Sequence, residues 1–410
     1  MESIDGIYYG FFIERNDSSF ILNLIKIDDL MKFKLIADPE FELDKEKLNS
    51  FSTPFLEVSN EEPLVENLFK GRTLNFYSNS WIKLKIENDK SGKTILYNLP
   101  DQDENVTCSI NFFKKMKNTD DETKTLIKTF SLTNVKESTV DEIQKIFTIS
   151  MKDILSNLFI SIYDVGHGNC NAICMADGTP IVYFDVGRSC GPNSKYFPSH
   201  LQLCTCTSPP VILSHWHQDH YGSAKYNHNI LNSYWLTKLN TRNLSPDAYK
   251  YASYLSRKNL LLIYPSSISN IRISYGNILS CTGITPNDSG LAFLSDIHNE
   301  LSLFSGDAKY KHIPLNTAIN NLVVSHHGGS NTTAPPNSTI NNSHFYSYAL
   351  DNTYNHPNVK TVKLHSKKWS QRKNTVHGSI GLFTSKVNMN INHHSQTVCH
   401  NHSIIYQNVK

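Results

Sequence analysis

The sequence lacks any apolar segment that approaches the ~20 residues needed for a membrane-spanning helix. Residues 1–5 also lack the basic stretch followed by an apolar one that marks a secretory signal. Its eight cysteines are scattered without a paired framework, which is typical of reduced intracellular proteins. We therefore expect a cytoplasmic protein that has no membrane-embedded part and is not itself a membrane channel.

Histidine is missing from the first 166 residues, and all 18 histidines lie at or beyond His167. Acidic residues are nearly missing from the other end, because residues 308–410 carry 10 Lys and Arg against one Asp. Residues 1–150 carry 19 basic against 26 acidic residues. Imidazole chemistry therefore belongs to the later part of the chain. The basic character of residues 308–410 favours an anionic partner such as a nucleic acid or nucleotide. A solvated basic face explains these counts equally well.

The length of 410 residues suits two domains. Residues 1–155 contain helical spacing at 120–130 and 140–155, and short apolar runs broken by turn-forming residues. These runs predict strands at 8–13, 20–27, 33–36, 74–77, 81–86 and 94–97. We expect a β-rich module of unknown role, which could bind a protein partner, regulate access or support dimerisation, followed by a second domain over residues 156–410.

Residues 211–223 read Val-Ile-Leu-Ser-His-Trp-His-Gln-Asp-His-Tyr-Gly-Ser, so an apolar strand ends in a loop rich in metal-binding side chains. Imidazole nitrogen and carboxylate oxygen both bind divalent metals. The spacing predicts that His215 and His217 share one metal, while Asp219 and His220 serve a second. The alternative is a polar loop whose histidines cap a helix, but matching elements that follow downstream argue against it.

The His-x-His-x-Asp-His pattern resembles that of the metallo-β-lactamase superfamily, and more closely its ComEC-like branch. The resemblance covers roughly residues 158–410. It implies an α/β fold, the αββα sandwich, in which two mixed sheets are flanked by helices. It also implies a hydrolase with two divalent metal ions, Zn²⁺ or Mn²⁺, which generate hydroxide from water.

Other residues match the family's motifs in chain order. The resemblance implies that Asp185, at a strand end, orients the metal-bearing loop and that Asp307, in Ser-Gly-Asp, bridges the two metals. Residues 322–326, Leu-Val-Val-Ser-His, repeat the pattern of residues 211–215, and that parallel predicts that His326 binds the second metal, with His327 beside it or reaching the substrate. The order of that pair stays open.

Two segments depart from the family pattern. Residues 164–169 read Asp-Val-Gly-His-Gly-Asn where the branch has Asp-Val-Gly-Gln-Gly-Asp, which predicts Asp164 and His167 beside the site. No histidine precedes the apolar strand at residues 291–294, where many members place a third ligand for the first metal. Asn287 and Asp288 stand in that place. Either Asp288 takes over as an oxygen ligand, or the first site is one ligand short, and a plain Pro-Asn-Asp-Ser turn is the alternative reading of residues 286–289.

Residues 352–357 (Asn-Thr-Tyr-Asn-His-Pro) and 378–380 (Gly-Ser-Ile) resemble elements that distinguish the ComEC-like branch. They predict that Asn352 binds substrate and that His356 contacts the scissile group or protonates the leaving group. A histidine packed in a turn is the alternative for His356. We also predict a catalytic role for Asp219, and that Lys368 and Arg372 guide the substrate.

Three functions follow from these patterns. The first is a metal-dependent phosphodiesterase or nuclease that acts on a nucleotide or nucleic acid. The second is a phosphocholine-esterase-like or lactonase-like hydrolase on the same scaffold, because a fold does not decide the substrate. The third is a sensor or interaction protein whose weakened first metal site no longer supports turnover.

Overall fold

The computed structural model divides the chain into two compact units. One comprises Met1–Val135 with Thr241–Lys258, and the other comprises Lys136–Asn240 with Asn259–Lys410. No helix within the described part of the chain is long and apolar enough to cross a bilayer. The structure describes residues 4–15, 19–38, 40–60, 62, 80–97, 105–132, 135–148, 158–199, 201–239, 244–330, 333–382 and 406–407.

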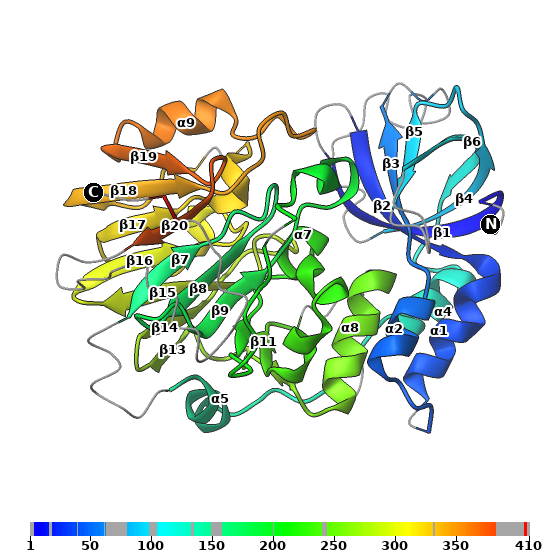
Figure 1. Ribbon diagram of the computed structural model, residues 1–410. Coiled ribbons are helices and arrows are strands. Elements are labelled where there is room, and N and C mark those ends of the chain that lie inside the picture. Colours follow the sequence, from blue (N-terminus) through cyan, green and yellow to red (C-terminus); the bar gives the residue numbers. More distant parts are fainter. Residues whose placement is uncertain are drawn as a thin grey trace. The chain divides into compact units, whose positions relative to one another are not determined.

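The first unit contains a closed six-stranded barrel in the order β1-β2-β3-β5-β6-β4 (Figure 1). Closure pairs every strand on both sides, and Leu22, Leu56 and Leu84 fill the interior. The strands are β1 (Gly6–Arg15), β2 (Ser19–Lys26), β3 (Phe55–Ser59), β4 (Trp81–Asn88), β5 (Thr94–Tyr97) and β6 (Val106–Lys115). The predicted β-rich module is confirmed. The sequence did not predict β3 and β6, and the strand expected at residues 74–77 lies outside the described residues.

Helices accompany this barrel within the first unit. They are η1 (Ile27–Asp29), α1 (Leu30–Ala37), α2 (Lys45–Ser50), α4 (Asp121–Thr129) and α8 (Pro246–Arg257). The strand predicted at residues 33–36 is wrong, because Phe33 and Ile36 are buried three positions apart on one face of α1. The predicted helix at residues 120–130 is confirmed as α4.

Helix α8 comes from the later part of the chain but belongs to the first unit, where buried polar contacts hold it. The backbone N–H of Asp247 donates to Asn23 Oδ1 at 2.8 Å, and Thr53 Oγ1 donates to the Asp247 carboxylate at 2.7 Å. The same carboxylate lies 2.8 Å from Lys250 Nζ. The unit that we expected to be residues 1–155 therefore also includes residues 241–258.

The second unit contains two sheets. The eight-stranded sheet has the order β12-β11-β10-β9-β8-β7-β20-β21 and the seven-stranded sheet the order β13-β14-β15-β16-β17-β18-β19 (Figure 1). The first consists of β7 (Phe159–Ile162), β8 (Cys170–Cys174), β9 (Pro180–Val186), β10 (Val211–Ile212), β11 (Trp235–Thr237), β12 (Leu261–Ile263), β20 (Ser379–Leu382) and β21 (Tyr406–Gln407). The second consists of β13 (Asn270–Ile273), β14 (Gly276–Ser280), β15 (Leu291–Ile297), β16 (Glu300–Phe304), β17 (Ile319–Val323), β18 (Ser338–Tyr346) and β19 (Gln371–Asn374).

One apolar core joins the two sheets. The rings of Phe184 on β9 and Phe304 on β16 lie 5.7 Å apart between their centroids. Ile143 and Phe147 of α5 (Val140–Phe147) pack into the same core. Because α5 packs into the core of the second unit, that unit begins at residue 136, before the boundary that we expected after residue 155. The α/β class of the prediction is confirmed.

Short helices follow the strands that lead to the predicted site. They are η3 (Gly191–Tyr196), α7 (Gln218–Tyr221), η4 (Gly222–Lys225), η5 (His228–Asn232), η6 (Tyr310–His312), η7 (Ser325–Gly328) and α9 (Val359–His365). The spacing of apolar residues predicts one helix over residues 222–239, which is wrong, because the segment forms two short 3₁₀ helices and then β11. The same patterns predict a helix at 246–258 and edge strands at 260–264 and 271–275, and the structure confirms these three elements.

The buried pair Asp247–Lys250 in α8 provides a test of this packing. Asp247→Ala leaves the Lys250 ammonium buried without its carboxylate, so we expect the free energy of unfolding to fall by ~3–5 kcal/mol. The double variant Asp247→Leu, Lys250→Met removes both charges and should recover most of that loss. Urea unfolding measures both effects.

The matched control is Asp121→Ala, which breaks a Lys–Asp pair of the same spacing in α4. That pair is solvent-exposed, with side-chain exposures of 61% and 97%, against 5% and 3% for the pair in α8. Asp121→Ala should therefore leave the free energy of unfolding unchanged. Equal effects of Asp121→Ala and Asp247→Ala would show that α8 does not depend on its buried pair.

Candidate metal centre

The predicted ligands lie at or just beyond the ends of four strands. Strand β9 pairs in parallel with β10, and β16 pairs in parallel with β17. The carboxyl ends of parallel neighbours meet at one edge of a sheet, where loops can bring side chains together. Asp185 lies in β9, His215 follows β10, Asp307 follows β16 and His327 follows β17.

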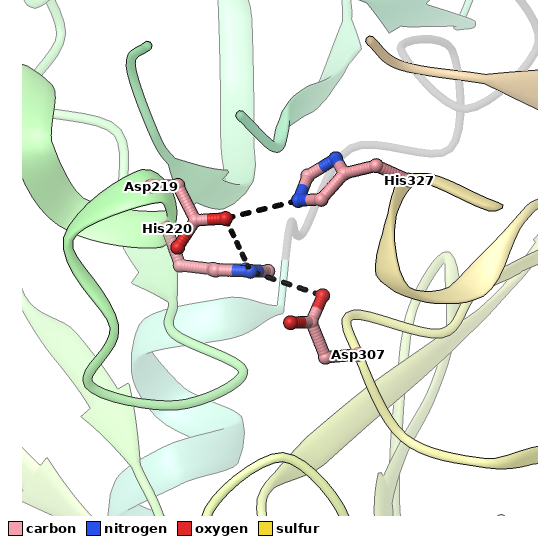
Figure 2. Close-up of side chains that lie close together, drawn as sticks. All are labelled: Asp219, His220, Asp307 and His327. Carbon is pink, nitrogen blue, oxygen red and sulfur yellow. Dashed lines mark hydrogen bonds and ion pairs between the residues drawn. The ribbon is translucent and has the colours of Figure 1, made fainter. Parts of the chain in front are cut away.

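The first group of ligand atoms comes from Asp219, His220, Asp307 and His327, and these atoms all lie within 4.8 Å of one another. Figure 2 shows the four side chains converging from three segments of the chain. Asp219 Oδ2 lies 3.0 Å from His327 Nε2 and 3.7 Å from His220 Nε2. His220 Nε2 lies 3.1 Å from Asp307 Oδ1. This spacing leaves room for one cation among them.

The second group comes from His215, His217 and Asp307, again within 4.8 Å. The rings of the two histidines have centroids 4.4 Å apart, and His215 Nε2 lies 3.7 Å from Asp307 Oδ2. Asp307 therefore belongs to both groups, with Oδ1 toward His220 and Oδ2 toward His215. All three residues of this group are buried.

Hydrogen bonds fix which nitrogen of two rings is left for a ligand. His327 Nδ1 lies 2.8 Å from the Ser347 carbonyl, which can only accept, so Nδ1 carries the proton. His220 Nδ1 lies 2.7 Å from Asp185 Oδ2 and donates in the same way. In the neutral rings, each Nε2 lone pair then faces a carboxylate, which is unfavourable unless a cation lies between them.

Buried polar atoms that lack hydrogen bonds also indicate that the centre holds a cation. Within the described residues, His215 Nε2 is buried without a hydrogen-bond partner, and His220 Nε2 and Asp307 Oδ1, 3.1 Å apart, are buried with no partner other than each other. Burial opposes protonation of His220, but the carboxylates of Asp307, Asp219 and Asp185 outweigh it and raise its pKa well above its usual value. Divalent cations would satisfy all three atoms, and the nitrogen and oxygen donors fit Zn²⁺ or Mn²⁺.

Asp185 supports the ligand loop from a fully buried position. Its Oδ1 accepts from the Ser214 N–H at 2.7 Å, and its Oδ2 accepts from Ser214 Oγ at 2.9 Å and Asn169 Nδ2 at 3.1 Å. Burial raises the pKa of Asp185, and its contacts with His220 and Ser214 oppose that rise. At Gly187 nearby, a Cβ would collide with the carbonyl oxygen of Asp219, so glycine lets the two backbones approach.

Of the two adjacent histidines whose order the sequence left open, the structure places His327 in the first group of ligand atoms. His327 is 3% exposed and lies in the first group, whereas the His326 side chain is 33% exposed and its Nε2 is 3.7 Å from Asp307 Oδ2. Both residues have a φ of 54°. Two successive left-handed residues turn the chain so that His327 points inward and His326 lies at the accessible edge.

Asp288 does not join either group. Its Oδ1 accepts from the Lys309 N–H at 2.9 Å, and its Oδ2 accepts from Lys309 Nζ at 2.8 Å and Thr285 Oγ1 at 2.9 Å. Burial raises its pKa, but the contacts with Lys309 and Thr285 outweigh burial and lower it. The Asp288 carboxylate therefore binds Lys309 and Thr285 and is not part of a ligand group. Its neighbour Asn287, which also stands in the place of the missing histidine, has Nδ2 3.4 Å from Asp307 Oδ2.

His167 and His356 form a wall beside the first group. The His167 ring lies 4.7 Å from that of His327, 4.9 Å from that of Tyr354 and 5.4 Å from that of His356. His356 lies 5.3 Å from His326. Burial, together with neighbouring histidines, lowers the pKa of both His167 and His356 well below the usual value, so both rings are neutral at pH 7.

Asp164 and Asn352 hold turns instead of reaching the ligand groups. Asp164 Oδ1 accepts from the Gly166 N–H at 3.0 Å, and its own N–H donates to Ser379 Oγ at 2.9 Å. Asn352 Oδ1 accepts from the His356 N–H at 3.0 Å, and Asn352 Nδ2 donates to the His356 carbonyl. Asn352 therefore positions His356, which differs from its predicted contact with substrate.

Lys368 and Arg372, predicted to guide substrate, make contacts elsewhere. Lys368 Nζ donates to the Pro335 carbonyl at 3.2 Å, and the Arg372 guanidinium lies 5.3 Å from the Tyr346 ring. Sequence reasoning missed Ser214 and Ser347, whose polar atoms orient the ligand histidines. For Ser214 the sequence did contain a signal, because this serine stands between an apolar strand and a histidine.

Comparison of the chain with models of known protein families gives no match, and a search of curated proteins also gives none. The geometry of this centre and the chemistry of its donors are therefore what indicate the function of the chain.

The order of His326 and His327 can be tested by metal affinity. We expect His327→Ala to weaken Zn²⁺ binding by at least ~10–100-fold. That is the loss typical of removing a residue that only hydrogen-bonds to a metal ligand, and removing a ligand itself should cost no less. His326→Ala is the matched control and should bind Zn²⁺ nearly as tightly as the wild type. Competition with a chromophoric chelator measures both. A greater loss in His326→Ala would contradict the assignment.

The support from Asp185 gives a second test. Asp185→Asn keeps the side-chain size but removes the charge that orients His220, so we expect Zn²⁺ affinity to fall by ~10–100-fold. Asp288→Asn, also at a buried carboxylate, should leave the affinity unchanged because Asp288 binds Lys309. Titration calorimetry on chelator-treated protein gives both affinities. Equal losses in the two variants would contradict the role assigned to Asp185.

Proposed function

We propose that the second unit is a metal-dependent hydrolase of the metallo-β-lactamase fold, close to the ComEC-like branch, which cleaves a phosphodiester in a nucleotide or nucleic acid. One observation carries the proposal: the Asp307 carboxylate is shared by two ligand groups. A bridging carboxylate between two metals about 3.5–4 Å apart is typical of metal-dependent hydrolases.

The ligand counts support catalysis over a purely structural role. The group of His215, His217 and Asp307 offers three protein ligands. Structural zinc sites usually have four protein ligands, whereas catalytic sites have three and leave a position for water. The missing third histidine is therefore compatible with turnover. Two facing sheets with a common apolar core are the scaffold that the metallo-β-lactamase sandwich requires.

Bound Zn²⁺ or Mn²⁺ would supply a water of lowered pKa and would polarise the phosphoryl oxygen. Within the chain, Asp219 stays ionised because the contacts with His220 and His327 outweigh burial and lower its pKa. It therefore acts as a ligand or proton acceptor. His356 is neutral, so it donates or accepts a hydrogen bond at the substrate, and Asn352 holds its backbone.

The substrate class follows from charge and exposure. His326, one third exposed at the edge of the centre, is available to a substrate oxygen. Residues 308–410 carry 10 Lys and Arg against a single acidic residue, which favours an approaching phosphodiester over a neutral ester or lactone.

Turnover of bis-p-nitrophenyl phosphate by the full chain with added Mn²⁺ or Zn²⁺ tests the proposal. We expect Asp307→Asn to lower kcat on the order of 10³-fold, because metal polarisation is worth several kcal/mol and ~1.4 kcal/mol is tenfold. Chelation should abolish turnover and added metal should restore it.

The matched control is Asp296→Asn, which changes an exposed aspartate on β15 and should leave kcat unchanged. A lactone and a thioester assayed in parallel distinguish the other hydrolase classes. Wild-type turnover by Asp307→Asn, or metal binding without hydrolysis of any of the three substrates, would contradict the proposal.

A further inference from the structure

A cavity of about 650 Å³ lies in the second unit, where residues 197, 199 and 201–206 and the η4–η5 segment line it. Arg188 is the one charged residue in its described lining. The polar side chains that accompany it are neutral, and they include Gln202, Thr205 and Asn229. A cavity of this size accommodates a small organic ligand, since such sites typically measure about 300–1,000 Å³.

The Arg188 guanidinium is held between two aromatic rings. Its Cζ atom lies 3.7 Å from the centroid of Phe197 and 3.8 Å from that of Tyr226. A guanidinium that lies over aromatic rings is attracted through its charge and its planar face, and such contacts leave its N–H groups available for hydrogen bonds. The rings thus hold the cation in place without using its donors.

No carboxylate in the described part of the chain pairs with this cation. Burial lowers the pKa of Arg188, and the remaining influence is that of the Tyr226 hydroxyl. A half-buried cation without a counter-ion is unfavourable, because it has lost water and gained no opposite charge. An anionic ligand in the cavity would compensate for that loss.

The backbone on both sides of Arg188 is fixed by hydrogen bonds. The Gly187 carbonyl accepts from Ser223 Oγ at 2.7 Å, and the Ser189 N–H donates to the Val165 carbonyl at 2.9 Å. The segments that wall the cavity also carry metal-centre residues, since Arg188 follows Asp185 and Ser223 follows His220 by three positions each. The guanidinium is therefore preorganised for a ligand.

We infer that this cavity binds a phosphorylated small molecule of mononucleotide size, with its phosphoryl oxygens on the N–H edge of Arg188. The planar fork of arginine matches phosphate oxygens with two parallel hydrogen bonds. The neutral polar side chains would bind the uncharged remainder, and the volume exceeds that of a phosphate ion alone. This inference holds whether or not the metal centre turns over a substrate.

Titration calorimetry with adenosine 5′-monophosphate tests the inference on chelator-treated full-length protein, so that metal ions cannot bind the phosphate. We expect the wild type to bind it, and adenosine to bind at least about tenfold more weakly because it lacks the charged group. Arg188→Met should weaken binding by a similar factor, whereas Arg272→Met, at an exposed arginine on β13, should not.

A second variant covers the case in which Arg188→Met does not fold. Asn229→Asp adds a negative charge at an exposed position of the cavity wall without changing the aromatic pair, and we expect it to weaken binding as well. Inorganic phosphate should compete with the nucleotide. Wild-type affinity in either Arg188→Met or Asn229→Asp, or equal affinity for adenosine, would overturn the inference.

Discussion

The imidazole of His220 lies between two buried carboxylates, and the rest of the centre depends on that arrangement. Its Nδ1 is 2.7 Å from Asp185, which belongs to the eight-stranded sheet, and its Nε2 is 3.1 Å from Asp307, which follows a strand of the seven-stranded sheet. Burying several carboxylates together is unfavourable unless positive charge accompanies them. Protons on the histidines provide that charge when metal is absent, and divalent cations provide it better.

The packing of the two sheets fixes the distance between these carboxylates. Phe184, next to Asp185, contacts Phe304, three residues before Asp307. The residues that form the apolar core are therefore adjacent in sequence to those that carry the chemistry. A rigid core limits how far the ligands can move apart, and such preorganisation lets a metal bind without paying a large ordering cost.

The parts predicted from sequence are those in which local pattern decides the outcome. An apolar run followed by polar donors identified the His215 loop, because a strand end is a local feature. The roles of Asp185 and Asp307, each near a strand end, came from the resemblance to the metallo-β-lactamase superfamily. Short-range pattern could not order His326 and His327, since two left-handed residues reverse their directions. Nor could it show that Asp288 binds Lys309, or that Asn352 closes its own turn, because those partners are set by the folded backbone.

The barrel and helix α8 show a different limit. Strands β3 and β6 complete the closed barrel, yet β6 has few buried residues and no clear alternation, so closure is a property of pairing and not of one segment. Helix α8 was recognised as a helix from its spacing. Its place in the first unit depends on Asn23 and Thr53, more than 190 residues earlier.

Proton and metal binding are alternatives at the same two nitrogens. The Nδ1 atoms of His220 and His327 are committed to Asp185 and to the Ser347 carbonyl, so only Nε2 can change its partner. A metal that binds there must displace any proton that the carboxylates have attracted, and metal binding therefore releases protons. The same hydrogen bonds that make the rings basic also aim their lone pairs at the metal. Asp185 and Ser347 thereby govern both the charge of the centre and its geometry.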